Sequence, residues 1–175
     1  MQTGIILPIL QAGPATRAIR ERWDAQAVAT RVPPHITLLF PFRTSESINR
    51  ATLTAVGRVF AAHAPFDLAL GGLCGFEDGT VYLGPEPLEP IDDLIAALAA
   101  AFPDTPPYGG RFADSRPHLT LGLVGIAAEL GAVATCFEAA YTGGLLPSSI
   151  RVETATLLAQ GDSGRWRTLR QFPLG

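Results

Sequence analysis

Two pentapeptides in this chain have nearly the same sequence, and together they carry two of its three histidines. They are Pro34–Leu38 and Pro117–Leu121, and each reads Pro, His, aliphatic, Thr, Leu. Alternate side chains of an extended strand share one face, so the His and the Thr of each copy lie together, opposite the two aliphatic residues. One His-x-Thr is commonplace in a half-exposed strand. Two matching copies predict a site with two imidazoles and two hydroxyls.

The predicted site has the groups needed for in-line displacement at phosphorus. If the two copies face each other across a pseudo-twofold axis, one imidazole accepts a proton from the attacking oxygen while the other donates one to the leaving oxygen. Histidine suits both tasks because its ordinary pKa is ~6.5. The hydroxyls of Thr37 and Thr120 would donate to the non-bridging oxygens, where charge builds up in the transition state. His35 and His118 are therefore the candidate acid–base pair.

Other chemistries of paired histidines are less well supported by the sequence. A catalytic zinc ion normally has three protein ligands, and His63 is expected at the end of a helix, where it would stabilise the last carbonyls. The chain has no G-x-S-x-G motif and neither of the glycine-rich phosphate-binding motifs. The sequence predicts no metal and no cofactor.

The expected elements form an alternating pattern of strands and helices, in which the order helix, motif strand, helix and hairpin occurs twice. We expect an Asp-Gly turn at Glu77–Gly79 between the two strands of the first hairpin, and Ser45 as a helix cap. The strands are expected at 3–10, 35–40, 66–74, 80–83, 118–124, 149–159 and 165–172, the helices at 14–26, 45–63, 90–102 and 126–140, and a loop at 103–114. The length of 175 residues suits a single domain, 1–175.

The composition restricts the class of protein. Hydrophobic residues make up 47% and charged residues 17%, which is enough apolar material for a core. The net charge of −3 gives no general attraction for long duplex nucleic acid.

No apolar run approaches the ~20 residues of a membrane span, and the start does not resemble a secretory signal. Cys74 and Cys136 fit no metal or redox spacing and are expected as reduced core residues. We therefore expect a cytoplasmic monomer.

The doubled motif resembles that of the 2H phosphoesterase superfamily, whose members include LigT-like 2′-5′ RNA ligases and RNA 2′,3′-cyclic phosphodiesterases. The resemblance extends over nearly the whole chain, including Pro33-Pro34 before the first motif and Phe40-Pro41-Phe42 after it. It implies an α+β, bilobal fold of two intertwined lobes, with two pseudo-symmetric antiparallel sheets around a central groove and helices outside. It also implies metal-independent opening of a cyclic phosphodiester, with His35 and His118 as the acid–base pair and Thr37 and Thr120 as ligands of the phosphate oxygens. Our own expectation is that His35 acts as acid towards the leaving ribose oxygen and His118 as base towards water.

Several substrate-binding residues are expected around the motifs. Phe42 or Tyr82 could stack a base, and the charge of Arg116 could assist phosphate binding. RNA-directed members often carry a basic residue shortly after the second motif, whereas Gly122 and Leu123 follow it here. That difference and the acidic net charge favour a small cyclic phosphodiester or a nucleotide end over an RNA polymer. The alternatives are 2′-5′ ligation or cleavage by the same residues, and a non-catalytic module that binds a nucleotide.

Overall fold

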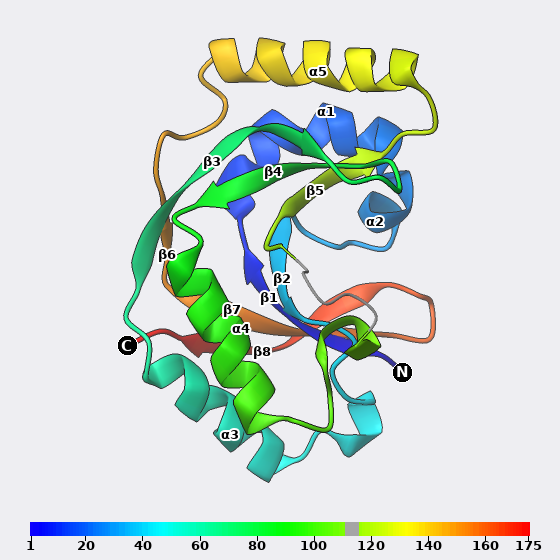
Figure 1. Ribbon diagram of the computed structural model, residues 1–175. Coiled ribbons are helices and arrows are strands. Elements are labelled where there is room, and N and C mark those ends of the chain that lie inside the picture. Colours follow the sequence, from blue (N-terminus) through cyan, green and yellow to red (C-terminus); the bar gives the residue numbers. More distant parts are fainter. Residues whose placement is uncertain (111–115) are drawn as a thin grey trace.

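The computed structural model describes residues 1–110 and 116–175, which form a strongly curled antiparallel sheet with helices around it (Figure 1). Its eight strands follow the order β6-β3-β4-β5-β2-β1-β7-β8. The strands are β1 Thr3–Pro8, β2 His35–Leu39, β3 Phe66–Gly75, β4 Thr80–Glu86, β5 Leu119–Leu123, β6 Ile150–Val152, β7 Thr154–Gln160 and β8 Trp166–Pro173. The α-helices are α1 Gly13–Trp23, α2 Ala25–Ala29, α3 Arg50–Ala61, α4 Glu89–Ala101 and α5 Ala127–Thr142. Short 3-10 helices cover Leu10–Ala12, Ser45–Ser47 and Pro107–Gly110.

The two motif strands, β2 and β5, are neighbours in the middle of the sheet. They pair antiparallel through Ile36 and Leu119, and this pairing joins the half β6-β3-β4-β5 to the half β2-β1-β7-β8. The predicted α+β class, with antiparallel halves and helices outside, is confirmed. The two expected sheets, however, form one continuous curled sheet, because both inner strands have backbone groups free to pair with each other.

The helices cover the sheet at its two ends. In Figure 1, α1 and α5 lie together at the top, while α3 and α4 lie together at the bottom. Helix α1, from the first half of the chain, packs on β5 of the second half, and α4 packs on β2. The buried aliphatic residues of the motifs belong to a continuous hydrophobic core that reaches both groups of helices. Burial on one face therefore holds the motif residues in place on the other.

Some element boundaries differ from the sequence expectation for local reasons. Helix α3 begins after Asn49, whose side chain accepts a hydrogen bond from the Thr52 amide at 2.9 Å; Ser45 lies in a separate 3-10 turn and is not the cap. The expected helix 14–26 divides into α1 and α2 at Asp24, whose φ of −139° is not helical. The expected strand 149–159 divides into β6, which pairs with β3, and β7, which pairs with β1. Residues 111–114 of the expected loop lie outside the described part of the chain.

The cysteines and the first hairpin turn give a mixed result. Both thiols are free, as expected, but Cys74 is exposed and only Cys136 packs against the core. The Asp-Gly turn is confirmed, since Asp78 accepts from the Thr80 amide and Gly79 adopts a φ of +88°. None of the helices within 1–110 and 116–175 combines the length and the apolar character needed to cross a bilayer.

Candidate active site

The pairing of β2 with β5 brings the two motifs together. Ile36 lies opposite Leu119 in the antiparallel ladder. Continuing that register by one residue in each direction puts His35 opposite Thr120 and Thr37 opposite His118. Directly opposed side chains in such a ladder lie about 5 Å apart. All four polar side chains are half-buried, and they share one face of the sheet.

Each catalytic candidate is held by the same backbone contact. His35 Nδ1 lies 2.8 Å from the carbonyl oxygen of Pro33, and His118 Nδ1 lies 2.7 Å from that of Arg116. A carbonyl only accepts, so each Nδ1 carries the hydrogen and donates it, which leaves the Nε2 lone pair of the neutral ring available. A proline stands between donor and acceptor in both motifs, and its fixed φ restricts the backbone there. This contact explains why the repeat includes proline.

The surroundings of His35 favour its neutral form. Burial lowers the pKa of His35 to about 4, a hydrogen bond to Pro33 opposes that shift, and the positive charges of Arg20 and His118 lower it further. Arg20 is itself buried, with 5% of its surface exposed. Its guanidinium contacts Asp24 at 3.3 Å and donates to the Val32 carbonyl at 2.9 Å. At neutral pH the His35 ring is uncharged and lies near a fixed positive charge.

His118 lies in an aromatic environment instead. Its ring meets Phe76 edge-on, with centroids 5.1 Å apart, and lies 5.3 Å from the Tyr82 ring at a tilt of 59°. Phe76 and Tyr82 stack on each other with centroids 4.3 Å apart. Contacts on these sides limit ring rotation about the Nδ1 hydrogen bond. The two halves of the site therefore share a backbone geometry but differ in what surrounds each imidazole.

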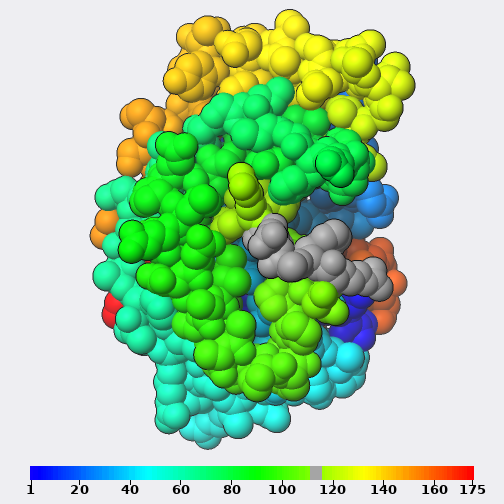
Figure 2. All heavy atoms as spheres, viewed as in Figure 1, coloured from blue at the N-terminus to red at the C-terminus, as the bar shows by residue number. Residues whose placement is uncertain are grey.

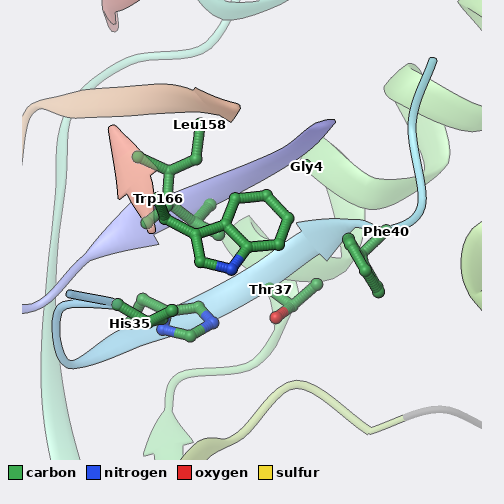
Figure 3. Close-up of a pocket in the computed structure, with 8 residues that line it drawn as sticks. Gly4, His35, Thr37, Phe40, Leu158 and Trp166 are labelled. Carbon is green, nitrogen blue, oxygen red and sulfur yellow. The ribbon is translucent and has the colours of Figure 1, made fainter. Parts of the chain in front are cut away.

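A pocket of about 160 Å³ opens beside the first motif (Figure 3). His35 and Thr37 supply its polar wall, and Phe40 and Trp166 its aromatic one. The remaining lining comes from Gly4, Ile6, Val32 and Leu158. Phe40 reaches this face because the β1–β2 register shifts between Ile5 and Ile6. The shift buries Leu38 and Leu39 together and turns Phe40 to the side of Thr37.

The expected substrate-binding residues are distributed differently. Arg116 and Tyr82 line a second pocket of about 170 Å³, which also includes Pro117 and Glu86, next to His118. Tyr82 is 8% exposed and is packed between other rings. Phe42 lies in the core with 5% of its surface exposed and meets Phe102 edge-on at 5.0 Å. Phe42, the expected base-stacking residue, therefore lies outside both pockets. Phe40, two residues earlier, lines the pocket beside His35 instead.

Sequence reasoning did not identify Arg20, Trp166 or Tyr108 as neighbours of the site. Burial raises the pKa of the Tyr108 hydroxyl, and a hydrogen bond with Thr37 opposes that rise. The Tyr108 amide donates to the Phe40 carbonyl at 2.6 Å, so its segment lies against the end of β2, on the face of the molecule shown in Figure 2. The sequence does contain a signal for Trp166. It stands between Arg165 and Arg167 in an expected strand, so its side chain lies on the face opposite to theirs.

The possible metal ligands are scattered over the described part of the chain. There, His, Cys, Asp and Glu side chains form no group of three or more that could hold a metal ion. His63, the third histidine, contacts the Val59 carbonyl through Nδ1 at 2.7 Å, which is the helix-end role predicted for it.

Comparison with known proteins agrees with this fold. The chain has 20% identity and a TM-score of 0.64 to the crystal structure of TT0787 from Thermus thermophilus, covering 99% of this chain and 98% of that one. It has 19% identity and a TM-score of 0.53 to E. coli LigT complexed with 3′-AMP, covering 99% and 97%. A protein of Oceanobacillus iheyensis named "Putative phosphoesterase OB1230" is 26% identical over 133 residues, which are 74% of this chain and 72% of the relative.

The fold is LigT-like. The family model for the 2′-5′ RNA ligase superfamily matches residues 8–164, a span that contains both motifs. The chain belongs to the 2′-5′ RNA ligase superfamily.

Proposed function

We propose that this protein is a metal-independent phosphoesterase that opens a cyclic phosphodiester, a 2′,3′-cyclic nucleotide or an RNA 3′ end, by acid–base catalysis with two histidines. The observation that carries the proposal is the pair of imidazoles on adjacent antiparallel strands, each with Nδ1 bound to a carbonyl. Membership of the superfamily supports activity on phosphodiesters. LigT has been crystallised with 3′-AMP and with phosphate, and 3′-AMP is the type of product that ring opening yields.

The proposed reaction is a hydrolysis. Water attacks phosphorus while one imidazole takes its proton at Nε2. The bond from phosphorus to one ribose oxygen breaks, and the second imidazole gives its proton to that oxygen. The products are a phosphomonoester and a ribose hydroxyl. Thr37 and Thr120 would donate to the non-bridging oxygens.

The environment of His35 bears on which imidazole starts protonated. From the sequence we expect His35 as the acid. With a pKa lowered to about 4, His35 is neutral in the free protein, which is the form that a general base requires. To serve as acid it must first take up a proton, and the negative charge of a bound phosphodiester favours that uptake. Both routes use the same geometry.

The deciding experiment is turnover of 2′,3′-cyclic nucleotides in EDTA. The wild type is compared with His35→Ala and His118→Ala, and His63→Ala, which changes the histidine at the helix end, is the matched control. Loss of each proton-transfer group costs about 10²- to 10⁴-fold, so we expect both site variants to lose activity and the control to keep it. Wild-type activity that depends on added metal would contradict the mechanism.

The superfamily match also supports a second candidate, the joining or cleavage of 2′-5′ phosphodiester bonds. The same four residues would act on it, because both reactions displace a ribose oxygen at phosphorus. Short 2′-5′ linked oligonucleotides assayed beside cyclic nucleotides separate the two functions by their products. Nucleotide affinity that survives both histidine substitutions, with no turnover of any substrate, would identify a binding module instead.

A further inference from the structure

We propose that the pocket beside His35 is a subsite for the nucleobase of the substrate, and that Trp166 of the C-terminal hairpin is the residue that selects for it. The inference rests on the proposed function for the identity of the reacting group. The part of the substrate that is recognised is the nucleobase, and the side chain that recognises it is Trp166.

The pocket has room for one ring of a nucleobase, and its chemistry suits an aromatic group. Its volume is about 160 Å³, and an apolar cavity of ~150 Å³ in an engineered protein holds one benzene ring. Apart from His35 and Thr37, its lining is glycine, aliphatic and aromatic. None of the described side chains that line it carries a permanent charge. Such a wall suits a neutral, flat group, and the phosphate would lie on the polar side, at His35 and Thr37.

The aromatic rings are arranged so that one ring supports the other. The Phe40 and Trp166 rings lie edge to face, with centroids 5.9 Å apart and planes at 65°. Figure 3 shows the indole between Leu158 and Phe40, with His35 and Thr37 on the strand beside it. A Cβ at Gly4 would lie 3.0 Å from the Phe40 ring. The absence of a side chain at residue 4 therefore makes room for this arrangement.

The backbone that carries the indole is held in place before any ligand binds. The Trp166 amide donates to the Thr30 carbonyl at 2.8 Å, which ties β8 to the end of α2. The β7–β8 hairpin is closed by the Gln160 side chain, which donates to Gly164 at 3.2 Å. A side chain on a fixed backbone has less conformational freedom to lose on stacking, so more of the stacking energy appears as affinity.

The pocket has few groups that could distinguish one base from another. Base-edge recognition needs donors and acceptors opposite the base, whereas stacking tolerates every base because each has a π-face. The polar groups of the lining belong to the phosphate side of the site. We therefore infer that the enzyme accepts all four nucleobases, but acts poorly on a cyclic phosphate that has no base.

The first test measures turnover on two substrates. One is 2′,3′-cyclic AMP and the other is glycerol 1,2-cyclic phosphate, which has the same five-membered ring and no base. Stacking on an aromatic side chain contributes about 1–3 kcal/mol per base, so Trp166→Ala should lower kcat/KM for cyclic AMP by about 5- to 150-fold. Trp166→Phe should restore part of the loss. Turnover of the baseless substrate should fall much less than that of cyclic AMP, whereas a general folding defect would lower both equally.

The second test measures binding directly and does not depend on turnover. In a Trp23→Phe background Trp166 is the single tryptophan of the chain, so its fluorescence reports on the pocket. We expect 3′-AMP to quench it, inorganic phosphate to leave it unchanged, and Trp166→Ala to bind 3′-AMP more weakly by calorimetry. Trp23 lies on α1 against Gly122 of β5, so it is a matched change elsewhere.

The outcomes separate the two proposals. If neither cyclic substrate is turned over but 3′-AMP still quenches Trp166, the proposed function fails and the base subsite stands. If the wild type turns over both substrates equally well, or if Trp166→Ala binds 3′-AMP as tightly as the wild type, the subsite proposal is wrong and the phosphoesterase proposal stands.

Discussion

At the scale of single residues, the two histidines share one anchoring contact and differ in their environment. The Nδ1 of each ring donates to a carbonyl two residues earlier, which fixes the tautomer that a proton-transfer group requires. His35 also lies near the buried Arg20, whereas His118 lies against two aromatic rings. Pseudo-symmetric motifs therefore do not make equivalent residues, and the acid and the base can be told apart experimentally.

A change of leaving group tells them apart. A p-nitrophenyl phosphodiester releases an anion that needs no proton, so loss of the general acid costs little on this substrate, while loss of the general base still costs about 10²-fold or more. We expect one of His35→Asn and His118→Asn to recover activity on it and the other to remain inactive. Recovery of both variants, or of neither, would contradict the division of roles.

Tyr108 gives a second prediction at this scale. Its hydroxyl forms a hydrogen bond with Thr37, so Tyr108→Phe removes that contact and keeps the ring. We expect a fall in kcat/KM of a fewfold to about tenfold, because a neutral hydrogen bond is worth about 1 kcal/mol. In a Thr37→Ala background the same change should have no effect, whereas it should keep its full effect with Thr120→Ala. Equal effects in both backgrounds would show that Tyr108 does not act through Thr37.

At the scale of elements, the site depends on how closely α1 approaches β5. A Cβ at Gly122 would lie 2.4 Å from the Trp23 Cβ and 2.8 Å from the Trp23 carbonyl oxygen. These atoms belong to the helix near its backbone, so they cannot move aside easily. Packing therefore requires a glycine directly after the second motif. This accounts for the small residue near the place where RNA-directed members often carry a basic one.

Gly122→Ala should lower the free energy of unfolding by about 1–3 kcal/mol through overpacking. Gly84→Ala in the neighbouring strand β4 is the control, since a Cβ there would meet nothing within 4 Å. Urea denaturation of both variants measures the difference. Equal stabilities would show that α1 can move away from β5 without cost.

At the scale of the whole molecule, burial of His35 links stability to pH. The pKa of His35 is about 4 in the folded chain and ~6.5 when unfolded. Below pH ~6.5 the unfolded chain takes up a proton that the folded chain does not. The stability associated with a neutral His35 is therefore present above pH ~6.5 and is lost as the pH falls towards 4.

We expect His35→Asn to remove this dependence. Between pH 7 and pH 5 the wild type should lose at most about 2 kcal/mol more of its unfolding free energy than the variant does. Denaturant unfolding of both proteins at the two pH values measures the difference. Because Arg20 and His118 face His35, Arg20→Met should lessen the effect, and parallel pH profiles would show that His35 titrates normally.

The motif residues and the faces they occupy can be derived from the amino-acid sequence without a fold. Alternation along a strand is a local property, so placing His35 with Thr37 and His118 with Thr120 needed no knowledge of the fold. The hairpin at Asp78-Gly79 was equally local, because the turn depends on residues that adopt positive φ.

The surroundings of the motif residues depend on long-range packing and could not be derived from the sequence. The joining of two sheets through Ile36 and Leu119 depends on strands far apart in sequence, and local rules do not reach that far. The shift in the β1–β2 register turned Phe40 towards the pocket, whereas Phe42 lies in the core. Trp166 reaches the same pocket from the last strand because the sheet curls. Local patterns fix which face a side chain takes, and long-range pairing fixes which other side chains it meets.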